Sequence, residues 1–185
     1  MARHAVAVAA ARSLLVKRLV RVLPEAAPGL PSLQLELVCP IAERLRGWPA
    51  LAVEEWLAAS LAARRQADGE AGGAGLGVHR SDLAIAGGPN GTPAAIASTG
   101  EQKALLLSVV LAHAALIAEY RGFAPLLLLD EAAVHLDPER RAALLAILAA
   151  SSAQILLTGT DAEPFRSLGE AAEVLRAGGG QLTQG

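Results

Sequence analysis

The chain has few aromatic, cysteine and lysine residues. Aromatic residues make up 3% of its 185 residues, Cys39 is the single cysteine, and Lys17 and Lys103 are the two lysines. One cysteine excludes an internal disulfide framework and is typical of a reducing cytoplasm. Hydrophobic residues make up 53% of the chain. They are mostly alanine, leucine and valine, which suffice for a core of small side chains.

The chain also has no excess of positive charge. The formal net charge is -2, whereas a free-standing DNA-binding domain is usually basic. Any contact with nucleic acid must therefore be local or assembled by oligomerisation. The best apolar run, 104–118, is too short to span a bilayer and is interrupted by Ser108 and His113. The sequence therefore predicts a cytoplasmic protein without a membrane segment.

A phosphate-binding P-loop is absent from the sequence. That motif reads Gly-x-x-x-x-Gly-Lys-Ser/Thr, because backbone N–H groups and a lysine have to surround the phosphates. Neither lysine follows glycines at that spacing, and the glycine-rich segment 87–92 contains no lysine. We therefore expect that the chain by itself does not bind or hydrolyse ATP with useful affinity.

Hydrophobic periodicity and turn residues divide the chain into elements. They predict helices over 2–23, 53–67, 100–120 and 138–150, strands over 33–37, 83–86, 125–129 and 154–157, and a closing hairpin of 174–176 with 181–183. Pro24 and the segment Pro28-Gly29-Leu30-Pro31 are expected to end the first helix, and 87–91 is expected to form a turn. Five glycines within 68–77 predict a link between a first part, 1–75, and a second part, 76–185. Strand–helix–strand order in the second part predicts an α/β fold with a parallel sheet covered on both faces.

Two carboxylates follow the most apolar predicted strand. Four leucines, 126–129, end in Asp130 and Glu131, at the carboxyl end where open α/β sheets bind ligands. Asp130 can hold Mg²⁺ there directly or through water. Glu131 can orient and deprotonate the water that attacks a phosphoryl group. The alternative is a strand end with two solvated acids.

Two predicted helix N-termini accompany this strand. Ser98-Thr99-Gly100-Glu101-Gln102-Lys103 opens the long helix, where Ser98 and Gly100 can present a hydroxyl and free backbone N–H groups to an anion. The alternative is a plain capping box between Ser98 or Thr99 and Glu101. Asp137, directly before Pro138, can cap the following helix.

The order of these motifs resembles the C-terminal half of an ABC-type ATPase head. The resemblance implies that the signature turn contacts the γ-phosphate bound on a partner subunit, with Ser98, Gly100, Glu101 and Gln102 as its residues. It implies that Asp130 is the Walker B aspartate, Glu131 the catalytic glutamate, and Asp137 part of the D-loop at the dimer interface. The segment 158–161, where the family places a switch histidine, has none. Thr158 or Thr160 is the substitute that we consider there.

Within ABC ATPases, the segment 76–176 resembles the RecF family of DNA replication and repair proteins. The segment Gly77-Val78-His79-Arg80-Ser81-Asp82-Leu83, the signature turn, the acidic strand and the Thr-Gly-Thr-Asp turn carry this resemblance. Val78 stands where the family usually has proline, and Ser81 where it has an acid. The resemblance implies that 76–185 is the C-terminal half of the ATPase head, and that 1–75 is the remainder of a helical lobe that helps embrace DNA.

The RecF resemblance also implies cofactors and partners. ATP and Mg²⁺ are expected only together with the P-loop half. The implied partners are DNA at single-strand gaps and single/double-strand junctions, a second copy or a P-loop-bearing partner, and recombination mediator proteins. The implied processes are replication, recombination, repair and the SOS response. The alternatives are a non-catalytic interaction domain and another SMC-type head, although no long heptad segment precedes the signature turn.

Overall fold

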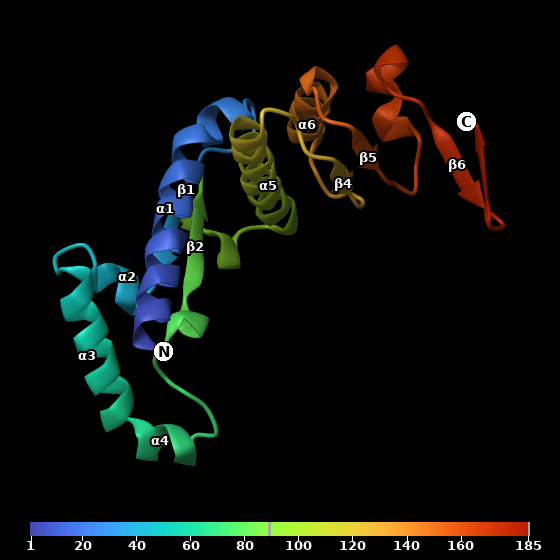
Figure 1. The fold of residues 1–185 in the computed structure, drawn as a ribbon. Helices are drawn as coiled ribbons and strands as arrows, with labels where there is room; N and C mark the ends of the chain where they lie inside the picture. The colour runs from blue at the N-terminus through green and yellow to red at the C-terminus, as the bar shows by residue number, and fades with distance from the viewer. Residues whose placement is uncertain (89, 185) are drawn as a thin grey trace. The chain divides into compact units, whose positions relative to one another are not determined.

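The computed structural model describes residues 1–88 and 90–184 and separates into two compact units (Figure 1). One unit contains Met1–Arg21 and Gln34–Ala86, and the other contains Val22–Leu33 and the residues from Gly87 onward. The predicted turn over 87–91 includes Pro89, which lies outside the described residues. The predicted division into 1–75 and 76–185 concerns lobes of the family and stays a prediction.

The first unit is mainly helical. Its elements are α1 (Ala2–Ala26, up to Arg21), β1 (Leu33–Val38), α2 (Pro40–Arg44), α3 (Ala50–Ala63), α4 (Arg65–Glu70), the short 3-10 helix η1 (Val78–Arg80) and β2 (Asp82–Gly87). β1 and β2 are neighbouring strands of one sheet, and the two-residue strand β3 (Thr92–Pro93) belongs to the second unit. Its core is a cluster from α1, α2 and α3 that includes the fully buried Ala9, Ile41, Val53 and Leu57.

Pro24 does not itself end the first helix, which ends at Ala26, just before the Pro28-Gly29-Leu30-Pro31 segment that was also predicted to stop it. α1 continues to Ala26 with Pro24 inside it, and the Ala27 N–H still donates to the Leu23 carbonyl at 3.1 Å. A proline removes one helical hydrogen bond, to the carbonyl four residues earlier. That residue is Val20, which is exposed, so water can take the place of the missing donor.

The helix predicted over 53–67 is divided into two. α3 ends at Ala63 and α4 begins at Arg65, and the glycine-rich segment after α4 folds back on it. The Gly75 N–H donates to Asp68 Oδ1 at 3.0 Å, and Arg64 Nε lies 3.8 Å from the same oxygen. These contacts give the beginning of the predicted link a defined structure.

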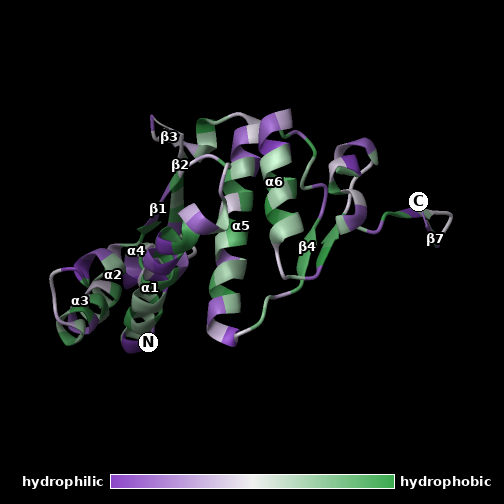
Figure 2. Cartoon of the chain, turned by 90° about the horizontal axis from the view of Figure 1, so that it is seen from above, coloured by the Kyte–Doolittle hydropathy of each residue, from purple (hydrophilic) through white to green (hydrophobic). Residues whose placement is uncertain are grey.

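The second unit contains the strand–helix–strand segment. Its elements are the 3-10 helix η2 (Ala94–Ile96), α5 (Thr99–Arg121), β4 (Leu127–Leu129), α6 (Pro138–Ala150), β5 (Ile155–Leu157), the 3-10 segment η3 (Glu163–Ala171), β6 (Leu175–Gly178) and β7 (Gln181–Gln184). β4 and β5 pair in parallel, with Leu127 opposite Ile155 and Leu129 opposite Leu157, as predicted. α6 lies beside α5, with β4 and β5 next to it (Figures 1 and 2).

The parallel sheet is covered on one face, so the prediction of two covered faces is wrong. Leu127 and Leu129 are buried in one cluster with residues of α5 and α6. Side chains alternate between the faces of a strand, and Leu126, Leu128 and Leu156 are 53%, 68% and 54% exposed. Both helices pack on the same face, which leaves the other face of the sheet open in the described part of the chain.

α5 is a core helix. By length and composition it could cross a membrane, but core helices of soluble proteins pass the same test. Its residues Ala104, Leu107 and Leu111 belong to the core of the second unit. Packing therefore explains the apolar character of this face of α5.

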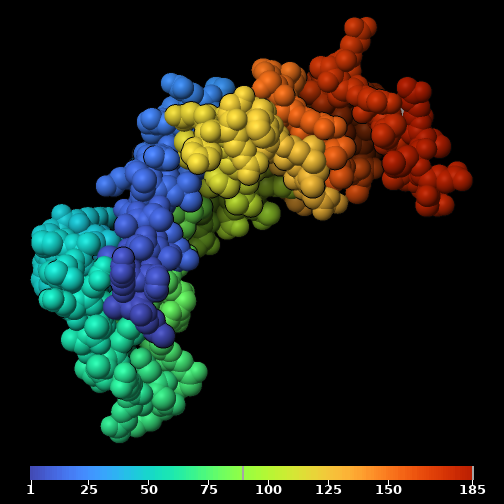
Figure 3. Space-filling view, in the orientation of Figure 1, coloured from blue at the N-terminus to red at the C-terminus, as the bar shows by residue number. Residues whose placement is uncertain are grey.

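The antiparallel hairpin at the end of the described chain is confirmed. β6 pairs with β7, and Arg176 lies opposite Thr183. Every residue of both strands is exposed, and the red atoms of this segment lie open at the surface in Figure 3. A two-stranded hairpin without a buried face is marginally stable by itself.

Candidate functional site

The first turn of α5 is closed by a capping box. The Glu101 N–H donates to Ser98 Oγ at 3.3 Å, while the Ser98 N–H and hydroxyl both donate to Glu101 Oε2, at 3.0 and 2.9 Å. The Gln102 side chain adds a hydrogen bond to the Ala97 carbonyl at 3.1 Å. The capping alternative is therefore confirmed for Ser98 and Glu101. Contact of this turn with an anion stays a prediction.

Glu101 is held in its charged form. The backbone N–H of Ser98 lowers the pKa of Glu101 most, and the Ser98 hydroxyl lowers it next. Burial raises this pKa by a smaller amount, and the charge and the hydrogen bond of Arg140 each lower it by still less. Arg140 Nη2 lies 3.7 Å from Glu101 Oε1. The capping box and the ion pair thus stabilise the same carboxylate.

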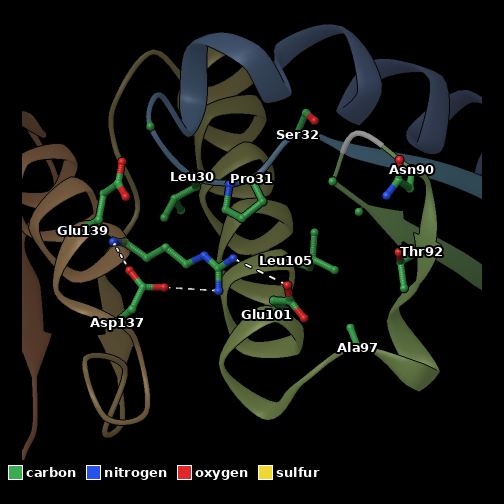
Figure 4. A pocket seen from close by; sticks show the side chains of 14 residues that line it. Leu30, Pro31, Ser32, Asn90, Thr92, Ala97, Glu101, Leu105, Asp137 and Glu139 are labelled. Atoms are coloured by element: carbon green, nitrogen blue, oxygen red, sulfur yellow. Dashed lines mark hydrogen bonds and ion pairs between the residues drawn. The ribbon is translucent and has the colours of Figure 1, made fainter.

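Asp137 caps α6, as predicted. Its Oδ1 accepts the Arg140 N–H at 2.8 Å, and Pro138 occupies the first turn, where its fixed φ suits a helix. Arg140 Nη1 also lies 3.2 Å from Asp137 Oδ2. The same guanidinium therefore joins the N-terminus of α5 to that of α6, and Glu101 and Asp137 point toward it in Figure 4.

A cavity of about 490 Å³ adjoins this bridge within the second unit. Its polar lining includes Ser32, Asn90, Thr92, Glu101, Asp137, Glu139 and Arg140. Arg140 already contacts two carboxylates, and Glu139 adds a third acid. Arg140 therefore acts as a brace between two helices, and the cavity has an acidic lining.

Asp130 and Glu131 follow β4, where the parallel ladder ends. The Thr158 N–H donates to the Leu129 carbonyl at 3.0 Å, which brings Thr158 beside both acids. The Thr158 hydroxyl donates to Asp130 Oδ1 at 2.5 Å and accepts the Glu131 N–H at 3.0 Å. Both acidic residues are exposed. Of the two threonines considered for the switch position, Thr158 is the one that contacts Asp130.

The loop after β4 has an unusual backbone. Glu131 and His135 have φ values of 48° and 63°, in the left-handed region that residues other than glycine seldom adopt. Lys103 Nζ donates to the Glu131 carbonyl at 2.5 Å and to the Val134 carbonyl at 2.9 Å. Lys103 thereby connects the signature-like turn of α5 with the acidic turn.

Two residues of this site were missed from the sequence. Lys103 reaches carbonyls 28 and 31 residues further along the chain, and no local pattern indicates such a contact. Arg140 follows Asp137 by three residues, a helical spacing that could have indicated the ion pair.

The oxygens beside β4 suit part of a magnesium site. Mg²⁺ is usually held by one or two carboxylates together with waters and phosphate oxygens. Asp130 provides one exposed carboxylate, and the Thr158 hydroxyl lies beside it. No group of three or more His, Cys, Asp and Glu side chains suited to a metal occurs in residues 1–88 and 90–184. The described residues therefore fit a partial site that needs further oxygen ligands.

Curated proteins similar to this chain include RecF proteins of several bacteria. No protein-family model matches the chain. The DNA replication and repair protein RecF of Mesorhizobium japonicum is 45% identical over 178 residues, which cover 95% of this chain and 47% of that protein. The chain thus spans about half the length of the curated relatives that it matches.

Solved structures share the fold. The recombination mediator protein RecF-ATPrS of the RecFOR pathway aligns with a TM-score of 0.68 and 18% identity, over 88% of this chain and 43% of that one. An SMC ATPase, studied for ATP-driven dimerization and DNA-stimulated activation, aligns with a TM-score of 0.52 and 16% identity, over 91% of this chain and 80% of that one. The chain therefore shares the fold of part of an ABC-type ATPase head.

Proposed function

This chain corresponds to the C-terminal part of RecF-family proteins, and we propose that it supplies the signature and acidic half of an ATPase head in DNA replication and repair. The other half, which carries the P-loop, would come from further polypeptide on the same chain or from a partner. Without that half, the chain does not bind ATP with useful affinity, because its two lysines occur outside any P-loop motif.

The observation that carries this proposal is the convergence of two predicted motifs within one unit. Lys103, the fifth residue of α5, contacts the loop that begins with Glu131. Phosphoryl transfer depends almost entirely on positioning and on electrostatic stabilisation. In this proposal the first turn of α5 faces the anion and is connected directly to the acidic end of β4. Together they provide positioning and electrostatic stabilisation.

Within this proposal each site residue has a role. Glu131 orients and deprotonates the attacking water. Mg²⁺, held in part by Asp130, would neutralise charge on the phosphates when bound. Ser98, Gly100, Glu101 and Gln102 form the turn that faces the γ-phosphate bound on a partner head. Asp137 lies at the interface between the two heads.

The open face of the β4–β5 sheet supports the need for a second half. Parallel sheets occur almost only with both faces covered, and here Leu126, Leu128 and Leu156 are more than half exposed. A segment that covers these leucines would complete the sheet. The P-loop half of the head is the segment that we propose for this role.

We also propose the cellular setting from the family. The complete head would act in the cytoplasm as an ATP-closed dimer on DNA at single-strand gaps and single/double-strand junctions, together with recombination mediator proteins. Recombination and the SOS response belong to the same proposal. A membrane partner is not part of this proposal.

A non-catalytic interaction domain is the second candidate. The observation that favours it is that the signature-like turn is already occupied by hydrogen bonds and an ion pair within the protein. The N–H and the hydroxyl of Ser98, which could contact an anion, both donate hydrogen bonds to Glu101. Glu101 in turn pairs with Arg140. Such a turn is stable as a cap without any nucleotide.

A chimera tests the proposal and separates the two candidates. This chain replaces the matching 178 residues of Mesorhizobium japonicum RecF, and ATP hydrolysis and ATP-dependent dimerisation are measured with and without gapped DNA. We expect hydrolysis by the chimera, its loss in Glu131→Gln with dimerisation retained, and no change in Glu139→Gln, an exposed acid at the start of α6. Unchanged turnover in Glu131→Gln would reject the catalytic assignment. A folded chimera that dimerises with ATP but never hydrolyses it would favour the interaction domain.

A further inference from the structure

We propose that Lys103 is a positioning residue that fixes the catalytic turn against the first turn of α5, so that contact at the α5 N-terminus sets the direction of the Glu131 side chain. This inference rests on the proposed function. Lys103 would be the physical connection between the signature-like turn of α5 and the acidic turn after β4.

The Lys103 ammonium group is bound only to backbone oxygens in the contacts that the structure records. It donates to the Glu131 carbonyl at 2.5 Å and to the Val134 carbonyl at 2.9 Å, and its side chain is partly buried. Hydrogen bonds from a charged donor are roughly twice as strong as neutral ones. Two of the three ammonium N–H donors therefore hold the backbone of this loop.

The loop that Lys103 holds needs such support. Glu131 and His135 adopt φ values of 48° and 63°, and conformations of this kind persist where the surroundings determine them from several sides. At Glu131 both peptide groups are bound, the N–H by the Thr158 hydroxyl at 3.0 Å and the carbonyl by Lys103. The backbone is therefore fixed, while the residue remains exposed toward a ligand.

Gly100 provides a second connection between α5 and the same loop. A Cβ atom built at Gly100 would lie 2.6 Å from the His135 carbonyl oxygen, so the helix backbone approaches the loop more closely than a side chain allows. The N-terminal part of α5 thus meets the loop at Glu131 and Val134 through Lys103 and at His135 through Gly100. A ligand that shifts this turn would shift Glu131 with it.

The chain itself allows a direct test by NMR. In the wild-type protein, we expect a slowly exchanging ammonium signal for Lys103, with couplings to the Glu131 and Val134 carbonyl carbons, and no such signal for the exposed Lys17. Lys103→Met should remove the left-handed chemical-shift pattern of Glu131, Lys103→Arg should retain it, and Lys17→Met should leave it unchanged. A rapidly exchanging Lys103 ammonium group in the wild type would overturn the proposal, whether or not any variant folds.

The RecF chimera adds a kinetic measurement. Misplacement of a reacting group by about 1 Å can lower a rate about 100-fold, so we expect Lys103→Met to lower kcat by at least about 10-fold with KM for ATP and ATP-dependent dimerisation little changed. Lys103→Arg should recover part of kcat. Equal loss of kcat in both variants, or a change in KM alone, would overturn the positioning role. A wild-type chimera without hydrolysis would instead reject the proposed function, while the NMR measurement still decides the role of Lys103.

Discussion

The close approach at Gly100 makes one substitution especially informative. In Gly100→Ala, the new Cβ would lie 2.6 Å from the His135 carbonyl oxygen. Because that oxygen belongs to the backbone, a rotamer change cannot relieve the clash. The chain offers a matched control in Gly69→Ala, since Gly69 also lies inside a helix and a Cβ atom added there would have no neighbouring atom within 4 Å.

The two substitutions should therefore change stability in opposite directions. Alanine is favoured over glycine inside a helix by about 1 kcal/mol, so Gly69→Ala should stabilise by about 0.5–1 kcal/mol, less if α4 frays. At Gly100 the same gain is opposed by an overpacking cost of about 1–3 kcal/mol. We expect a net destabilisation of about 1 kcal/mol, and hence a difference between the variants of about 2 kcal/mol.

Two probes can follow the two units separately. Trp48 and Trp56 both belong to the first unit, so tryptophan fluorescence during urea unfolding reports the effect of Gly69→Ala. Native-state hydrogen exchange of buried α5 amides, such as that of Leu107, reports the effect of Gly100→Ala. Stabilisation of the second unit by Gly100→Ala would refute the close approach of Gly100 to His135.

Three further substitutions test other parts of the site. Thr158→Val keeps the shape but removes the hydroxyl that contacts Asp130, and urea unfolding should show a loss of about 0.5–1.5 kcal/mol. His135→Gly relieves a left-handed residue and should raise stability by about 0.5 kcal/mol in the same assay, since the backbone strain exceeds the entropy cost of glycine. The pKa of Glu101 is lowered from 4.5 by Ser98 and Arg140, so its contribution is complete above that pH and is lost as the pH falls through the lowered value. Glu101→Gln should therefore make stability less dependent on pH below about 4.5, and an unchanged acid-unfolding curve would contradict this assignment.

Several elements were predictable because their ends carry strong local signals. α6 has the predicted bounds, since Asp137 caps it and Pro138 occupies its first turn. α5 begins at the predicted capping box and ends at Gly122, whose φ of 77° closes the helix in the left-handed conformation. The parallel pairing of β4 and β5 followed from strand–helix–strand order. In each case the information lies within a few residues of the element.

Other features were not predictable because they depend on contacts between distant segments. The sequence indicates that Leu126 to Leu129 form an apolar strand, but coverage of its faces depends on where α5 and α6 pack. The end of α1 was misplaced because the proline rule does not include the exposure of Val20. The role of Lys103 depends on a left-handed backbone turn at Glu131, which the residue types there do not predict.

One additional segment would account for both the open sheet face and the partial magnesium site. Leu128 is the exposed residue of β4, and Leu126 and Asp130, which flank the strand at its two ends, are exposed as well. A segment that covers the two leucines must therefore also approach Asp130. Burying one leucine fully is worth about 1.5–3 kcal/mol, which favours stable docking of such a segment. If that segment carries the P-loop, the contact that completes the sheet also brings the phosphates to the acids, and folding of the head and assembly of its catalytic site become one event.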